Sequence, residues 1–194
     1  MALTRKGEAT RQRIVEGAAA EIRERGVLAT TLDDVRARTR TSKSQLFHYF
    51  PDGKEELLLA VARWEADRVL EAQQPALGSL RTWDDFETWR KIVVSHYTEQ
   101  GTHCPLNVVM SQIGRNTEGA QAVVQQMMRR WLEELTTGIE NLQATSETRP
   151  GITPKRAASA LLAGVQGGVL MLLTTGEPEH LEAALEHGLN ALRP

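Results

Sequence analysis

The stretch TTLDDVRARTRTSKSQLFHYFPDGKEEL, residues 30–57, contains three predicted helix starts. Each start has a hydroxyl or carboxylate side chain, followed three residues later by an acid or amide that can bond back to the first residue. These pairs predict short helices over about 32–39 and 43–49 and a longer helix that begins at Lys54. The pairs are Thr31 with Asp34, Ser42 with Gln45, and Asp52 with Glu55.

Two short helices joined by about three residues have the form of a helix-turn-helix, whose second helix lies in the major groove of DNA. Lys43, Ser44 and Gln45 occupy the first turn of that second helix, from which side chains contact base edges. Leu46 and Phe50, four residues apart, are predicted to face the core. Gln45 has two possible roles, which are to cap its own helix or to contact a base.

Residues around this helix are suited to bind the DNA backbone. His48 and Tyr49 are within reach of phosphates, and Lys54 lies at a helix N-terminus, which favours anions. Thr31 opens the preceding helix, and Arg40 lies in the turn, where Arg36 and Arg38 could add contacts. The predicted DNA-binding residues are Thr31, Arg40, Ser42, Lys43, Ser44, Gln45, His48, Tyr49 and Lys54.

The charge distribution agrees with a DNA-binding head. The 194-residue chain has a net charge of −2, but residues 1–50 carry +4 and residues 51–194 carry −6. A basic segment on an acidic body indicates that only the segment meets a polyanion. The N-terminus lacks the apolar run of a signal peptide, and one cysteine excludes an internal disulfide framework, so we expect a cytoplasmic protein.

Helical periodicity continues through the rest of the chain, and no run alternates as a strand does. We predict an all-α fold of about nine helices. The boundary is expected after residue 52, with a helix-turn-helix domain over 1–52 and a helical effector-binding and dimerisation domain over 53–194. The predicted helices cover about 8–25, 32–39, 43–49, 54–73, 82–100, 105–113, 118–142, 154–175 and 178–190.

Residues 10–57 resemble the DNA-binding domain of TetR-family transcriptional regulators. The residues that carry the resemblance are Thr30, Thr31, Val35, Ser42, Leu46, Phe47, Tyr49, Phe50 and Lys54. The resemblance implies a second half that dimerises through its last two helices and binds a small effector that weakens DNA binding. The turn departs from the family, because Thr39, Arg40 and Thr41 replace a small residue, glycine and an aliphatic residue. A left-handed Arg40 would cost about 1 kcal/mol relative to glycine.

Aromatic and methionine side chains on successive helices suit either a plain core or the wall of a pocket for a largely apolar effector. His96, Tyr97 and Gln166 are the polar candidates in that wall. The predicted effector-binding residues are Trp64, Phe86, Trp89, Val93, His96, Tyr97, Met110, Met127, Trp131 and Gln166.

Small residues recur on one face of the helix over 154–175, which permits close approach either to a partner helix or within one subunit. We expect a homodimer, because a twofold operator needs a twofold protein. The predicted interface residues are Ala160, Gly164, Gly168, Met171 and Leu185. The apolar run over 157–173 is too short and interrupted to predict a membrane helix.

Cys104, beside His103 at a predicted helix start, has the setting of a reactive thiolate. Histidine spacing predicts no metal site, and no cofactor is expected. The sequence therefore predicts a homodimeric DNA-binding regulator, most simply a repressor released from a palindromic operator by a small molecule. The alternatives are a redox or electrophile sensor that uses Cys104, an enzyme with Cys104 and a histidine, and a DNA-binding protein without a ligand.

Overall fold

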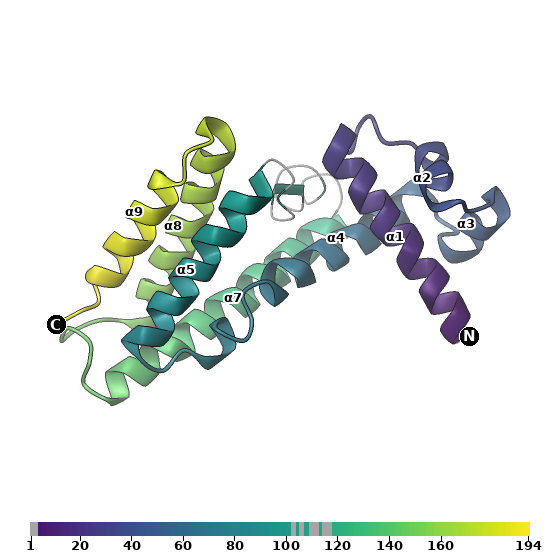
Figure 1. Cartoon of the computed structure of the whole chain (residues 1–194). Helices are drawn as coiled ribbons and strands as arrows, with labels where there is room; N and C mark the ends of the chain where they lie inside the picture. Colours follow the sequence, from purple (N-terminus) through teal and green to yellow (C-terminus); the bar gives the residue numbers. More distant parts are fainter. Residues whose placement is uncertain (1–3, 102–103, 105–106, 109–112, 114–117) are drawn as a thin grey trace. The chain divides into compact units, whose positions relative to one another are not determined.

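A computed structural model of the chain describes residues 4–101, 104, 107–108, 113 and 118–194. Those residues form eight α-helices and one short 3-10 helix, with no strand in the described part of the chain (Figure 1). The all-α prediction is therefore confirmed. The helix predicted over 105–113 lies largely outside the described residues, which accounts for the difference between nine predicted helices and eight.

The chain divides into two compact units, and unit 1 comprises Met1–Val69 and His103–Gln125. It contains α1 (Arg5–Arg25), α2 (Leu32–Thr39), α3 (Lys43–Tyr49) and α4 (Lys54–Glu71) through Val69. Its core is built mainly from one face of α1, which meets the buried side chains of α2, α3 and α4. The principal core residues are Ile14, Val15, Ala18, Ala19, Ile22, Val35, Leu46, Phe50, Leu57 and Val61.

Capping side chains set the starts of the first three helices. Thr4 accepts from the Gly7 amide, so α1 begins three residues before the predicted Glu8. The boxes predicted at Thr31 with Asp34 and at Ser42 with Gln45 are both present, and α2 and α3 have the predicted bounds. Local side-chain chemistry therefore determines where these helices begin.

The capping box predicted for Asp52 and Glu55 at the start of α4 was wrong, because the cap lies one residue later, at Gly53. Gly53 adopts a φ of 69°, and its carbonyl accepts from the Leu57 amide, so Gly53 takes the cap position. Glu56 is then the third helical residue, and its carboxylate accepts from the Asp52 amide at 3.2 Å in place of the predicted Glu55. A left-handed backbone at this turn favours glycine, because glycine lacks a Cβ.

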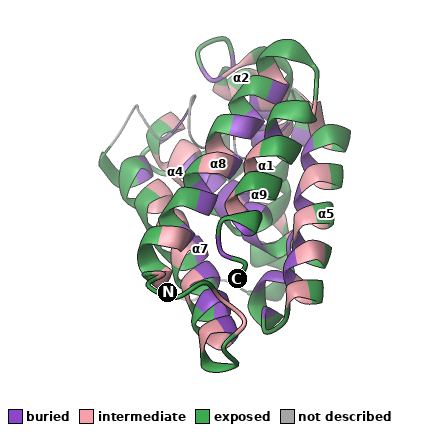
Figure 2. Cartoon of the chain, turned by 90° about the vertical axis from the view of Figure 1, so that its left-hand side faces the viewer, coloured by how far each residue is buried: buried purple, intermediate pink, exposed green. Residues whose placement is uncertain are grey.

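Unit 2 comprises Leu70–Thr102 and Gln126–Pro194. It contains the 3-10 helix η1 (Leu77–Ser79), α5 (Trp83–Gln100), α7 (Glu118–Ala144) from residue 126, α8 (Pro154–Thr175) and α9 (Glu179–Asn190). Figure 2 shows α5 with exposed residues along one edge and buried residues along the other. The capping box predicted at Thr82 with Asp85 is present at its start.

Close glycine contacts hold α8 against α9. A Cβ added to Gly168 would lie 2.5 Å from Leu181 Cα, and one added to Gly188 would lie 2.6 Å from Leu161 Cδ2. Within the described residues α8 is the one helix long and apolar enough to cross a membrane. Its buried residues pack inside unit 2, as those of a core helix do, so its composition is weak evidence for a membrane span.

The units divide the chain differently from the functional boundary predicted after residue 52, because most of α4 belongs to unit 1. That boundary concerns function, and it stays a prediction.

Candidate functional site

Helix α3 exposes the side chains that were predicted to enter the major groove. Lys43, Ser44 and Gln45 are exposed, while Leu46 is fully buried and Phe50 closes the helix in the core. Only the inward face of this short helix packs, so its leading turn is available to another molecule. An exposed and cationic first turn is the arrangement that groove binding requires.

Ser42 and Gln45 cap α3 reciprocally. The Gln45 amide donates to Ser42 Oγ at 3.1 Å, and the Ser42 amide donates to Gln45 Oε1 at 3.2 Å. This box uses the oxygen of the Gln45 side chain, whereas a bidentate contact with adenine uses both its oxygen and its nitrogen. Gln45 therefore caps α3, and a base contact from its nitrogen is compatible with that role.

The turn between α2 and α3 contains a strained arginine. Arg40 is left-handed, with φ 51° and ψ 43°, and its side chain is exposed beside the first turn of α3. The buried Thr39 hydroxyl donates to the Val35 carbonyl at 2.7 Å and lies 2.9 Å from the Thr41 hydroxyl. The two threonines thus replace the usual glycine-containing turn with a small buried hydrogen-bonded cluster.

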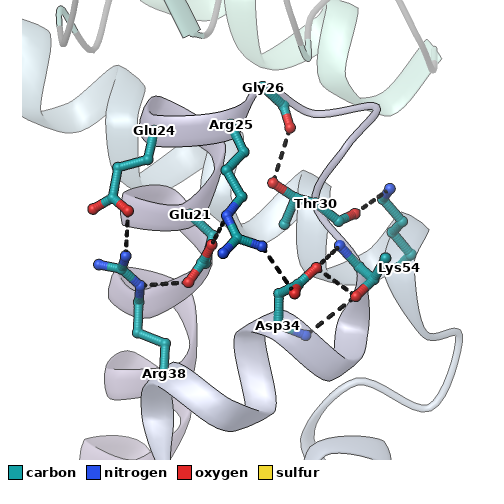
Figure 3. Close-up of polar contacts among 9 residues, drawn as sticks. Glu21, Glu24, Arg25, Gly26, Thr30, Asp34, Arg38 and Lys54 are labelled. Atoms are coloured by element: carbon teal, nitrogen blue, oxygen red, sulfur yellow. Dashed lines mark hydrogen bonds and ion pairs between the residues drawn. The ribbon is translucent and has the colours of Figure 1, made fainter.

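Two predicted phosphate ligands already have partners within unit 1. The amide and hydroxyl of Thr31 donate to Asp34 Oδ2 at 2.9 and 2.6 Å, and these bonds hold the pKa of Asp34 below its usual value. Lys54 is half-buried, and its ammonium donates to the Val27 carbonyl and to the Thr30 carbonyl, the second of which Figure 3 shows. Thr31 can bind a phosphate only if Asp34 releases its hydroxyl, whereas Lys54 has three N–H groups and uses two here.

Arg36 and Arg38, considered as further phosphate ligands, instead pair with carboxylates of unit 1. Arg36 bonds Asp33 at 2.6 Å, and Arg38 bonds Glu21 at 2.7 Å and Glu24 at 2.5 Å. The bond to Glu21 is the main cause that raises the pKa of Arg38. Arg38 links α2 to α1, whereas Arg36 pairs within α2. In both cases the carboxylates neutralise much of the positive charge that could bind a phosphate.

Arg25 extends the ion pairs of Arg38 with Glu21 and Glu24, and Figure 3 shows these residues together. It lies 3.4 Å from the buried Glu21 and 3.0 Å from Asp34.

His48 is exposed and Tyr49 is half-buried, with their rings edge to face at 4.9 Å. Both remain predicted phosphate ligands.

The predicted effector residues fall into two groups. Phe86, Trp89, Val93, Tyr97, Met127 and Trp131 are each no more than 2% exposed in unit 2, and His96 and Gln166 are half-buried there. Trp64 belongs instead to unit 1, where the guanidinium groups of Arg23 and Arg68 lie 5.7 and 4.7 Å from its ring centroid. Met110 lies outside the described residues.

Unit 2 also has a half-open groove of about 450 Å³ between η1 and α7. Arg81, Glu134 and Asn141 are among its lining residues, and none of the predicted effector residues lines it. No local sequence pattern indicates this groove, because its two sides are more than fifty residues apart in the chain.

The predicted interface residues are partly exposed and partly packed inside their own chain. Ala160 and Met171 are exposed, whereas Leu185 is fully buried and Gly168 packs on Leu181 of the same chain. A Cβ added to Gly164 would lie 3.5 Å from the Cβ of Ala184 on α9. Packing within one subunit, the alternative left open by the sequence, therefore accounts for the two glycines.

Cys104 is fully buried, and its neighbours His103 and Pro105 lie outside the described residues. Oxidant sensing requires an accessible thiolate, so the sensor alternative is not favoured. Among the described residues no group of histidine, cysteine and carboxylate side chains could hold a metal ion.

Comparison with known proteins gives matches to both halves of the chain. Residues 14–61 match the family described as "Bacterial regulatory proteins, tetR family", and residues 80–188 match the "Tetracyclin repressor-like, C-terminal domain". The second match alone covers more than half of the chain.

Individual relatives agree. An uncharacterised HTH-type transcriptional regulator of Mycobacterium tuberculosis is 31% identical over 105 residues, which are 54% of this chain and about half (53%) of that relative. An uncharacterised HTH-type regulator of Lactococcus lactis is 24% identical over 90% of this chain and 88% of its own length. The crystal structure of a TetR transcriptional regulator from Chloroflexus aurantiacus has a TM-score of 0.78 and 27% identity, covering 96% of each chain.

Proposed function

The chain belongs to the TetR family of bacterial regulatory proteins, and from that membership we propose a homodimeric repressor that binds a palindromic operator and is released by a small effector. TetR-family regulators are DNA-binding transcription factors and not enzymes, so the enzyme alternative is dropped. A cytoplasmic location follows from the proposal, because the operator lies there.

The observation that supports DNA binding most directly is the exposed first turn of α3. Lys43 and Ser44 project beyond the packed residues Leu46 and Phe50, and Arg40 lies beside them with an exposed side chain. In this proposal Lys43 contacts base edges, while Ser42, Arg40, His48 and Tyr49 bind phosphates on either side of the groove.

The net charges of the two segments support the same assignment. Residues 1–50 carry +4, although Arg36 and Arg38 are already paired with acids. Arg40 and Lys43 are therefore the exposed cations at the turn and the leading edge of α3. Their attraction to phosphates supplies a salt-dependent affinity for any duplex, and contacts with base edges add sequence preference.

Dimerisation is proposed through the face of α8 that does not pack in its own chain. Leu170 is 64% exposed and Met171 39% exposed, and a Cβ added to Gly167 would meet no atom within 4 Å. Ala160 and Ala163 are also exposed on this helix. Two copies that pair through this face would have to place their α3 helices about 34–36 Å apart, or a multiple of that, to bind one side of the duplex.

Release by an effector requires different affinities for the DNA-bound and released states. The effector residues are proposed to lie in unit 2. α4 follows α3 in unit 1 after a four-residue turn, and its last residues Leu70 and Glu71 belong to unit 2. A ligand that displaces the end of α4 would thereby change the spacing of the two α3 helices.

Selection of bound sequences from random duplex DNA tests the proposal. We expect a palindromic motif with half-sites one helical turn or a multiple apart, and an affinity that falls steeply with salt. Recovery of no enriched motif, or of a single half-site without symmetry, would contradict operator binding by a dimer.

A further inference from the structure

The three tryptophans of unit 2 differ in whether the indole N–H has a hydrogen-bond acceptor among the described residues. Trp83 Nε1 donates to the Glu147 carbonyl at 3.1 Å, and Trp89 Nε1 donates to Gln73 Oε1 at 2.8 Å. Trp131 is fully buried, like Trp89, but its Nε1 has no acceptor among the described atoms. An indole N–H is a donor only, so it cannot be satisfied in any other way.

Gln166 on α8 has the same property. Its Nε2 is buried and has no hydrogen-bond partner in the described part of the chain. Two other amide side chains of unit 2 are paired, since Asn141 donates to the Leu80 carbonyl and Gln143 to the Ile152 carbonyl, both at 2.8 Å. Native proteins leave few buried donors unpaired, and each exception requires an explanation.

The bond from the Gln143 side chain to the Ile152 carbonyl lies beside the turn that joins α7 to α8. Trp131 lies 12 residues before Gln143, and Gln166 lies 12 residues after Pro154, where α8 begins. At 1.5 Å per residue, each is about 18 Å from the closed end of the hairpin. The two unpaired donors are therefore about equally far along their own helices from the turn that joins α7 to α8.

α5, which carries further predicted effector residues, contacts α7 in unit 2. Leu80 accepts from Asn141, and a Cβ added to Gly138 would lie 3.0 Å from Phe86 Cζ, so α5 and α7 run antiparallel. Val93 lies seven residues after Phe86 on α5, and Trp131 lies seven residues before Gly138 on α7. Val93 and Trp131 are therefore each about two turns from this contact along their own helices, and both are buried in unit 2, as is Tyr97.

We propose that Trp131 Nε1 and Gln166 Nε2 donate hydrogen bonds to the effector, which is a neutral, largely apolar molecule with a carbonyl or similar acceptor oxygen. This inference rests on the proposed effector function of unit 2. The predicted effector residues of unit 2 are mainly aromatic and aliphatic side chains, which suit a neutral and largely apolar ligand. Burial from solvent does not distinguish a filled core from an enclosed site, whereas two buried and unpaired donors in one helical unit favour a site.

The first experiment needs no ligand and compares two matched substitutions in the full chain. Trp89→Phe and Trp131→Phe remove the same atoms from equally buried tryptophans, but only Trp89 loses a hydrogen bond to protein. We expect Trp89→Phe to lower Tm clearly more than Trp131→Phe, and Gln166→Leu to leave Tm unchanged or raise it. Equal losses for the two tryptophans would show that the Trp131 N–H is satisfied within the protein, and would overturn the proposal.

The second experiment uses ligand pairs that differ only in an acceptor oxygen. The probes are fluorene with 9-fluorenone, indane with 1-indanone, and diphenylmethane with benzophenone. For the wild-type chain we expect at least one ketone to bind about tenfold more tightly than its hydrocarbon partner, as judged by thermal shift and calorimetry. We expect this preference to disappear in the Trp131→Phe/Gln166→Leu double variant and to persist in Trp89→Phe. A set in which no ketone is preferred overturns the proposal.

Binding of the wild-type chain to its selected operator, measured without probes, separates this inference from the proposed function. DNA binding without any ketone preference would remove only the inference about the effector. A ketone preference in a chain that binds no DNA would support the donor pair and contradict the proposed repressor function.

Discussion

The ammonium of Lys54 donates to the carbonyl of Thr30 at 2.6 Å and to that of Val27 at 3.0 Å. Thr30 immediately precedes the cap residue of α2, so one side chain ties the start of α4 to the start of α2. The lysine that was predicted to bind a phosphate thus also holds the helix-turn-helix in place.

Lys54→Ala is expected to lower both stability and DNA affinity. The two carbonyls lose a charged donor, which costs about 1–3 kcal/mol in the free energy of unfolding. If Lys54 also binds a phosphate, affinity falls for every DNA sequence and the slope of log K against log salt decreases by about 0.9. Urea denaturation measures the first effect and salt titration the second, and an unchanged midpoint would contradict the tethering role.

Lys43→Ala is the matched control, because Lys43 is exposed. Its unfolding free energy should change by no more than about 0.5 kcal/mol. Binding should weaken and discrimination between the operator and single-base variants should fall by about 1–3 kcal/mol at the base that Lys43 contacts. If both affinity and base preference are unaffected, Lys43 does not lie in the groove.

Arg40→Gly should have opposite effects on folding and on binding. A left-handed backbone costs a non-glycine residue about 1 kcal/mol, so glycine should raise the free energy of unfolding by about that amount. Loss of a proposed phosphate contact should lower the salt slope by about 0.9. Arg40→Asn serves as the comparison, since asparagine tolerates this conformation but carries no charge. A destabilised Arg40→Gly variant would show that Arg40 makes a stabilising contact that outweighs the strain.

The helix starts that the sequence predicted well depend on side chains only three or four residues apart in the chain. The caps Thr31 and Ser42 are examples, because the cap and the residue that bonds back to it are adjacent on one turn. At Gly53 the same rule was wrong by one residue, since the pattern did not show that the left-handed glycine would take the cap position.

The less predictable features depend on partners far along the chain. Lys54 bonds Val27 and Thr30, Arg38 bonds Glu21, and Gly168 accommodates Leu181. A local pattern of charges identifies Arg38 as an exposed cation but does not show which acid approaches it. The unpaired Trp131 is likewise a property of the packed unit, because every buried tryptophan has the same signature in the sequence.

Gly17→Ala tests the approach of α1 to α2. A Cβ at Gly17 would lie 2.2 Å from Thr39 Cγ2, so the helices must separate or Thr39 must leave its hydrogen bond with Val35. Overpacking of this kind lowers the free energy of unfolding by about 1–3 kcal/mol. Thr39→Ser removes the obstructing methyl and keeps the hydroxyl. The double variant should therefore recover much of the loss, and additive effects of the two changes would contradict this contact.

Glu65 gives unit 1 a pH-dependent stability whose sign follows from its burial. Its side chain is fully buried on α4 and bonds Arg23, with Arg68 also nearby, yet desolvation outweighs both arginines and raises its pKa above the usual 4.5. A carboxyl with a raised folded pKa binds protons more readily in the native state, so its contribution to stability is most favourable below 4.5 and declines as pH rises through the folded pKa.

Glu65→Gln removes this titration while keeping the shape of the side chain. The difference in unfolding free energy, wild type minus variant, should decrease as pH rises above 4.5 and then become constant above the folded pKa. Urea denaturation at half-unit intervals from pH 4 to 8 measures it, and Glu55→Gln, on an exposed carboxyl of the same helix, is the control. A difference that instead increases over this range would mean that Arg23 and Arg68 outweigh desolvation and hold the buried carboxylate ionised.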